Sequence, residues 1–288
     1  RTGREVLTVP LARRVIWLQG GSVRDRPRDL VSRAMQHARP RQYDVDRSCP
    51  FKNKDLTMDV DVLLYVNSFL GASDKFDYNY RLLANNELTK SLPLITLFWV
   101  FWFLRPREGY PYREKVLASG CIAIAAIVIG RVLAVALPFR ERPIHNPSVQ
   151  SLIEGPVSTR VLEGWSSMPS DHAVLFAALC LCIFSMHKLT GVLISFYCFA
   201  MVLLPRIMYG LHWPSDVLVG ILVGCATTAL LLRPISRAFR TSGALEFLVR
   251  REAILYPAMF LLSFQMATMF KAAREIADLA FRVIAFVT

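Results

Sequence analysis

The chain has 288 residues, of which 54% are hydrophobic, and it carries a net charge of +12. A soluble domain is normally about 45–50% apolar, and here the excess lies in runs long enough to form membrane helices, which excludes an ordinary soluble protein. The basic residues are scattered between these runs and form no compact basic domain. This distribution favours loops that face anionic lipid over a nucleic-acid-binding surface. We therefore expect an all-α membrane protein with no nucleic-acid partner.

The first 57 residues differ from the rest because they contain 13 basic and 6 acidic residues. They lack the 7–15-residue apolar core that a signal peptide needs. We expect a disordered or loosely attached basic leader over 1–57. The sequence does not begin with Met, and Met58 opens the first well-patterned segment. The hypothesis that follows is a natural product that starts at or near Met58.

Residues 58–90 have the pattern of two short amphipathic helices. The first has an apolar stripe that ends at Gly71, and the second covers about 76–83. Neither helix is long enough to cross a bilayer, so both are expected in the membrane interface.

Apolar runs then follow one another through a membrane domain that we place at 91–271. They predict about six spanning helices, at 91–104, 116–137, 172–186, 192–204, 215–232 and 253–270. A long polar stretch precedes the third span, a basic loop is expected at 233–251, and an apolar interfacial tail at 272–288. Five of the six Cys lie inside apolar runs, where Cys behaves as a small hydrophobe. Their spacing indicates neither a disulfide framework nor a metal site.

The loops divide onto two sides of the membrane. One side, with loops 105–115, 187–190 and 233–252, carries ten Lys or Arg, and the other, with 138–171 and 205–214, carries four. The positive-inside rule places the first set in the cytoplasm, so the second set faces outward. We therefore expect the polar chemistry of the chain to face outward, away from the cytosol.

Two polar motifs lie in the first outward loop. Arg140 and Arg142 flank a turn after the second span and could hold an anion between them, although a basic interfacial cap has the same pattern. Ser170, Asp171 and His172 begin the third span, where backbone amides can bind phosphate. The alternative there is a simple helix cap, because Ser and Asp are favoured at that position.

A third motif lies in the second outward loop, where Arg206, His212 and Asp216 follow at steps of six and four. Arg206 could hold an anion, His212 could attack it, and Asp216 could orient the imidazole. Together they have the pattern of a catalytic nucleophile with its supporting groups. Charged groups at the edge of a span indicate function by default, and an interfacial turn with snorkelling side chains is the alternative.

Taken together, these motifs resemble the type-2 phosphatidic acid phosphatase superfamily, which is related in fold to vanadium haloperoxidases. The resemblance covers about 60–235. Its signature has three parts: Lys-x6-Arg-Pro, Pro-Ser-Gly-His and Ser-Arg-x5-His-x3-Asp. The chain matches these parts at Arg142-Pro143, at Pro169-Ser170 with His172, and at Arg206, His212 and Asp216.

The chain departs from that signature at three positions. Val135 stands where the first Lys is expected, and Arg140 or Arg131 could replace its charge. Asp171 replaces Gly, so its carboxylate would repel a dianion unless it is turned away or protonated. Pro205 replaces Ser and loses a hydroxyl.

The resemblance implies a phosphatase that uses no metal or other cofactor. His212 would attack phosphorus and form a phosphohistidine, Asp216 would orient it, and His172 would act as general acid and then base. Arg140, Arg142, Arg206, Ser170 and the Asp171 amide would bind the phosphate.

The substrate implied by the resemblance is a lipid phosphate held among membrane lipids. The chain looks most like the bacterial undecaprenyl-diphosphate phosphatase branch. This likeness implies a protein of the bacterial inner membrane whose site faces the periplasm or the outside. Phosphatidic acid, phosphatidylglycerol phosphate, lipid A phosphates and transfer of phosphate to another lipid stay open. A non-enzymatic membrane scaffold or transporter with an anion site, or a haloperoxidase, belongs to another class, and the six apolar runs argue against the haloperoxidase.

Overall fold

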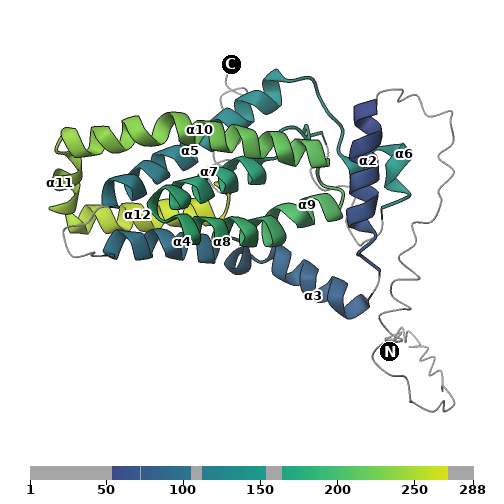
Figure 1. The fold of residues 1–288 in the computed structure, drawn as a ribbon, viewed down its shortest axis with the longest axis horizontal. Helices are drawn as coiled ribbons and strands as arrows, with labels where there is room; N and C mark the ends of the chain where they lie inside the picture. The colour runs from purple at the N-terminus through teal and green to yellow at the C-terminus, as the bar shows by residue number, and fades with distance from the viewer. Residues whose placement is uncertain (1–53, 72, 105–111, 154–163, 272–288) are drawn as a thin grey trace, which may run out of the picture. The chain divides into compact units, whose positions relative to one another are not determined.

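The computed structural model of the protein describes residues 54–71, 73–104, 112–153 and 164–271 (Figure 1). These residues belong to one compact unit, Asp44–Thr288. Within the described ranges the chain forms helices and no strand, which confirms the all-α prediction. The predictions for the leader before residue 54 and for the tail after residue 271 lie outside the described residues.

The helices follow in chain order and are named as in Figure 1. They are α2 (Lys54–Asn67), α3 (Asp74–Asn85), α4 (Glu87–Phe103), α5 (Arg113–Ala136), η1 (Pro143–His145), α6 (Pro147–Gln150), α7 (Asp171–Met186), α8 (Lys188–Cys198), η2 (Phe199–Leu203), α9 (Leu204–Met208), α10 (Pro214–Thr241), α11 (Ala244–Val249) and α12 (Glu252–Ala267). Each of the six predicted spans falls on a helix or on a continuous helical run.

Three of these helical segments are long and apolar enough to cross a membrane. They are α5 with 24 residues, α10 with 28, and the run Lys188–Met208 with 21 that α8, η2 and α9 form together. The helices α7 and α12 are apolar but have only 16 residues each, and α4 has 17. The polytopic helical bundle is therefore confirmed, whereas the number of six spans stays a prediction.

The fifth span is longer than predicted. We expected it to end at Leu232 before a basic loop, but α10 continues through Pro234 to Thr241. A proline inside a helix removes one backbone hydrogen bond, yet Leu232 and Ser236 on either side of it are buried and keep packing against the protein. The helix stops just before Gly243, whose φ of 70° only glycine adopts at little cost.

The helical run Lys188–Met208, which leads into the third motif, changes its helix type over a few residues. Residues Phe199–Leu203 form a π turn, and Pro205 follows directly in α9. Proline has no N–H and its ring collides with the carbonyl four residues earlier. A wider turn before Pro205 relieves that collision, and such turns recur at functional sites. This change sets the direction in which Arg206 and the loop after it leave the helix.

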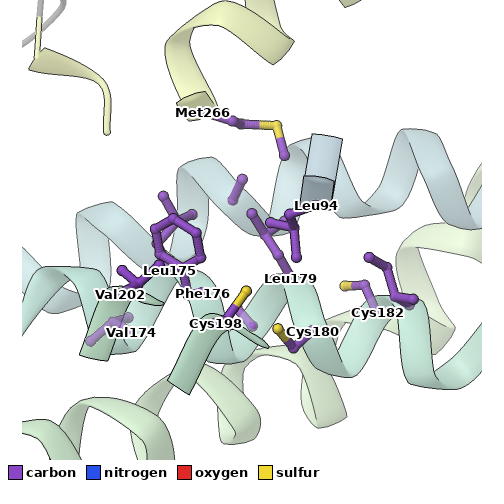
Figure 2. Close-up of a cluster of buried hydrophobic side chains, with 14 of the residues drawn as sticks. Leu94, Val174, Leu175, Phe176, Leu179, Cys180, Cys182, Cys198, Val202 and Met266 are labelled. Carbon is purple, nitrogen blue, oxygen red and sulfur yellow. The ribbon is translucent and has the colours of Figure 1, made fainter. Parts of the chain in front are cut away.

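The core is built around α7 (Figure 2). Leu175, Leu179 and Ile183 on this helix are almost fully buried. Side chains from α4 and α12, including Leu94 and Met266, pack near them. A β-carbon at Gly224 of α10 would lie 2.2 Å from the Val174 carbonyl oxygen of α7. Since real β-carbons do not come so close, only glycine allows this approach of the two helices.

We predict that Gly224→Ala destabilises the protein, because the added methyl group would press on the backbone of α7. Overpacking of this kind costs about 1–3 kcal/mol. Gly130→Ala is the matched control, since its β-carbon would meet Val174 at an ordinary 3.5 Å. Thermal unfolding in detergent measures both variants. Equal melting temperatures for the two would contradict the proposed contact.

Candidate active site

Backbone hydrogen bonds bring the three predicted motifs together at one end of the bundle. The amide of Ile144 donates to the Gly210 carbonyl at 3.0 Å, which joins the first motif to the third. The amide of Ser170 donates to the Asp216 carbonyl at 3.2 Å, which joins the start of α7 to the start of α10. The motifs therefore lie at one site, as the sequence predicted.

His212 lies in the buried centre of this site and is 5% exposed. Its Nδ1 is 2.8 Å from the Ser167 carbonyl oxygen. A carbonyl only accepts hydrogen bonds, so Nδ1 carries the proton and Nε2 keeps its lone pair. Arg142 Nη1 lies 3.1 Å from that Nε2. The imidazole is thus held in one tautomer, with its basic nitrogen beside a cation.

Asp216 lies next to the imidazole but does not bond it directly. Its Oδ2 is 3.8 Å from His212 Nδ1, beyond hydrogen-bond distance. The same oxygen accepts the Trp213 amide at 2.8 Å, and Oδ1 accepts Arg140 Nη1 at 2.6 Å. The direct contact to the imidazole is made by Ser167, a residue that sequence reasoning missed because a backbone carbonyl has no sequence signature. The orienting role of Asp216 stays a prediction.

The buried position of His212 keeps its imidazole neutral. Burial lowers the pKa of His212, and Asp216 offsets part of this effect, while the Arg142 guanidinium lowers the pKa further. The result lies below the ordinary value of about 6.5. At neutral pH the ring is therefore uncharged and can act as a nucleophile.

Arg142 is also buried, at 5% exposure, and it braces the same loop. Its Nη1 donates to the Leu211 carbonyl at 2.6 Å and its Nη2 to the Ser166 carbonyl at 3.2 Å. Burial lowers the pKa of Arg142, but a guanidinium that starts near 12.5 stays charged. The side chain therefore places a permanent positive charge against His212.

Several buried polar groups at this site have no hydrogen-bond partner among the described residues. They are Arg142 Nε, Arg206 Nε, Ser167 Oγ and Ser170 Oγ. Leaving a buried donor unsatisfied costs about 1–3 kcal/mol, and more for a charged group. The four groups belong to the segments that meet at this site, and donors of this kind fit the acceptor oxygens of a phosphate. The residues predicted to bind phosphate thus include three of the four: Arg142, Arg206 and Ser170.

The remaining predicted groups occupy the same end of the bundle. The Arg206 carbonyl accepts the amides of Leu211 and His212 at 3.0 and 3.1 Å, which fixes the turn that carries the imidazole. His172 is the second residue of α7 and is partly buried. Since the α7 start bonds the α10 start, the backbone of His172 lies near that of Asp216. Its acid–base role stays a prediction.

Arg140 is engaged by protein groups rather than open to a ligand. Nη1 donates to Ser215 Oγ at 2.7 Å and to Asp216 at 2.6 Å, and Nη2 donates to Asp59 Oδ2 at 2.6 Å. Its predicted contact with phosphate stays a prediction, and such a contact would have to replace one of these bonds. Asp59 on α2 was missed by sequence reasoning because it lies outside all three motifs.

Asp171 is paired with a cation from α5. Its Oδ2 forms an ion pair with Arg131 Nη2, and the Arg131 guanidinium also lies 4.9 Å from the centre of the Trp165 ring. Val135, at the position of the expected Lys, is 86% exposed. Arg131, one of the two residues that could replace the charge of the expected Lys, is thus the cation that offsets the carboxylate of Asp171.

The fold and this site define a helical membrane protein with a buried histidine and a set of cationic and hydroxyl donors. A family model described as the PAP2 superfamily matches residues 136–240, which include all of the predicted site residues. The decaprenylphosphoryl-5-phosphoribose phosphatase of Mycobacterium tuberculosis is 32% identical over 133 residues, which cover 46% of this chain and 68% of that protein. This chain belongs to the PAP2 superfamily.

Two further relatives from bacteria are similar to this chain. The bacitracin transport permease protein BcrC of Bacillus licheniformis is 32% identical over 43% of this chain, and the match spans only 56% of that relative. Lipid A 1-diphosphate synthase of Escherichia coli is 25% identical over 63% of this chain and 78% of that protein. A crystal structure of a transmembrane PAP2-type phosphatidylglycerolphosphate phosphatase from Bacillus subtilis aligns with 71% of this chain and 93% of its own, at 16% identity and a TM-score of 0.40.

We predict that the neutral imidazole of His212 takes up a second proton, on Nε2, only below pH 6.5, because burial disfavours the charged form. Replacing Asp216 by Asn removes a group that raises this pKa, so the midpoint should move to still lower pH. Nuclear magnetic resonance of labelled histidine in detergent measures both midpoints, with His212→Gln used to assign the signal. A midpoint above pH 6.5 in the wild type, or an upward shift in Asp216→Asn, would contradict the description of the site.

We predict that Arg131→Gln weakens binding of vanadate, a tetrahedral oxyanion, by at least tenfold. The variant leaves Asp171 without its ion pair beside the phosphate-binding groups, and charges a few ångströms apart repel by several kcal/mol at an effective dielectric of about 20. The double variant Arg131→Gln/Asp171→Asn removes the repelling charge and should recover most of the affinity. Isothermal calorimetry in detergent provides the measurement, and a double variant as weak as the single one would refute the pairing.

Proposed function

We propose that this protein is an integral membrane lipid phosphatase that hydrolyses a phosphate or diphosphate headgroup through a phosphohistidine. One observation carries the proposal. A neutral buried imidazole faces a permanent cation, while four buried polar groups on the segments that meet there have no partner among the described residues. A bare anion-binding site would need the donors alone, whereas a nucleophile held in a single tautomer is what covalent catalysis requires.

In the first step, Nε2 of His212 attacks phosphorus and the bond from phosphorus to the lipid oxygen breaks. His172 gives a proton to that leaving oxygen. The negative charge that builds on the equatorial oxygens is stabilised by Arg142, Arg206 and Ser170, and by the amide of Asp171 at the N-terminus of α7. Asp216, bonded to Arg140, stabilises the positive charge that the attacking imidazole acquires.

In the second step, His172 takes a proton from water, and the oxygen of that water attacks the phosphohistidine. The bond from phosphorus to Nε2 breaks, inorganic phosphate leaves, and His212 returns to its neutral form. Guanidinium groups supply the charge stabilisation that Mg²⁺ provides in other phosphoryl transfers. We therefore expect activity that EDTA does not reduce and vanadate inhibits.

The proposed substrate is a polyprenyl phosphate or diphosphate, with undecaprenyl diphosphate as the preferred choice. The lipid tail would lie in the bilayer beside α5 and α10, and the headgroup would enter the site from the periplasmic or outer side. Two observations support this choice. The membrane-length helices have one end at the site. The mycobacterial relative is named as a phosphatase of a decaprenyl-linked phosphate. Phosphatidic acid, phosphatidylglycerol phosphate and lipid A phosphates are the competing headgroups.

Transfer of the phosphate to a second lipid is the alternative reaction at the same histidine. Its support is the similarity to lipid A 1-diphosphate synthase, which extends over 198 residues. The phosphohistidine would then be attacked by a lipid phosphate in place of water. Radiolabelled substrate distinguishes the two, because hydrolysis releases labelled inorganic phosphate and transfer keeps the label in a lipid.

We predict that His212→Ala lowers kcat by several orders of magnitude on a panel of lipid phosphates and diphosphates in detergent, because the group that forms the covalent intermediate is removed. His187→Ala is the matched control, since this exposed histidine follows α7 at the end opposite to Ser170. It should keep nearly full activity. Near-normal turnover by His212→Ala would refute the nucleophile, and a wild type that binds vanadate yet releases no phosphate would indicate a non-enzymatic anion-binding protein.

A further inference from the structure

The helix α2 lies outside the residues that match the family model, yet it reaches the site with a buried carboxylate. Asp59 is 8% exposed and accepts three hydrogen bonds. Two come from Ser215, from its amide at 2.9 Å and from its hydroxyl at 2.5 Å. The third comes from Arg140 Nη2 at 2.6 Å. Asp59 therefore binds both the start of α10 and the first motif.

Arg140 connects this carboxylate to a second one. Its Nη2 binds Asp59 and its Nη1 binds Asp216, each at 2.6 Å. Asp216 in turn lies 3.8 Å from Nδ1 of His212. A guanidinium presents its donors in a fixed plane and can hold two carboxylates in set positions, whereas an ammonium group is a compact point charge without that fixed geometry. Hydrogen bonds thus run from α2 through Arg140 to Asp216, whose carboxylate lies beside the imidazole without bonding it.

The same helix is fixed at its other end. Asn67 is buried and its Nδ2 donates to the Met208 carbonyl at 2.7 Å. Eight residues separate Asp59 from Asn67, or about 12 Å along a helix. The two contacts hold α2 against α9 on one side of the His212 loop and against α10 on the other. Asp59 is consequently kept in place by backbone contacts that do not depend on Arg140.

A phosphate dianion in the site would compete for Arg140. An arginine bound to Asp216 alone could turn toward the dianion, because a dianion attracts a guanidinium more strongly than one carboxylate does. With Asp59 on its other fork, Arg140 has an anionic partner on each side and has less to gain by turning. The arrangement keeps Arg140 on Asp216 during the reaction.

We infer that Asp59 is a positioning residue for His212, acting through Arg140 and Asp216 to hold the orienting carboxylate in place while phosphate is bound. The inference rests on the proposed phosphatase function. It gives α2 a role in the chemistry besides its place beside α9 and α10. Asp59 itself does not touch the reacting atoms.

The variant Asp59→Asn tests this inference, because an amide keeps the size and an oxygen that can accept the Ser215 amide but loses the charge that holds Arg140. We expect kcat to fall at least tenfold while KM stays the same or decreases, since a released Arg140 becomes available to phosphate. A purely structural role of Asp59 would not lower kcat while leaving KM unchanged or lower. Asp61→Asn is the matched control, as this exposed residue lies two positions further along α2, and it should stay within about twofold of wild type.

Two further variants test the route through Arg140. Arg140→Lys keeps the charge but lacks the planar group that fixes both carboxylates in set positions, so it should show a similar loss of kcat even if Asp59→Asn does not fold. In the double variant Asp59→Asn/Arg140→Gln, kcat should be no lower than in Arg140→Gln alone, because both changes break one chain of contacts. Losses that multiply in the double variant, or a raised KM that accounts for the loss in Asp59→Asn, would overturn the inference.

The outcomes separate the inference from the function on which it rests. If wild type is active, His212→Ala is inactive and Asp59→Asn turns over like Asp61→Asn, only the role of Asp59 is refuted. If wild type releases no phosphate from any lipid phosphate, or if His212→Ala stays active, the proposed function fails and the role of Asp59 fails with it.

Discussion

The close packing of α7 against α10 is the constraint on which the site depends. A β-carbon at Gly220 would lie 2.8 Å from the Ser170 carbonyl, and one at Gly224 would lie 2.2 Å from the Val174 carbonyl. With only hydrogen at these two positions, the starts of the two helices come close enough for the Ser170 amide to bond the Asp216 carbonyl. That contact places the α7 N-terminus next to the loop that carries His212.

The positive charges of the candidate site are partly balanced by acidic residues. A site that binds a dianion must hold several cations close together before its ligand arrives, and like charges destabilise one another. Three acidic residues partly balance this charge: Asp171 pairs with Arg131, and Asp59 and Asp216 share Arg140. Arg142 has no carboxylate partner among the ion pairs of the described residues and bonds carbonyls and the imidazole. The cation that faces the nucleophile is therefore one that no ion pair of the described residues neutralises.

Membership of the PAP2 superfamily sets this chain among proteins with related motifs, and its own substitutions alter how the charges are arranged. The carboxylate at Asp171 and the cation at Arg131 come from different helices and meet beside the α7 N-terminus. Asp171 without Arg131 would not suit the proposed phosphate site, because an unpaired carboxylate repels a phosphate dianion. Taken together they form a neutral pair, which explains how an acidic residue can stand at that position.

The sequence by itself determined the helical membrane fold and predicted the candidate site. Apolar runs of the right length are a local signal, and so are His, Arg and Asp at fixed spacings, which is why the sequence could single out His212, Arg142, Arg206 and Ser170. Only the tertiary structure decided the partners. The Ser167 carbonyl bonds the imidazole, Arg140 turns to two carboxylates, and α10 continues past Leu232 because its far end still packs. Hydrogen-bond partners and ion pairs depend on which segments meet in space, and no local pattern at Asp59 indicates that α2 would meet the start of α10.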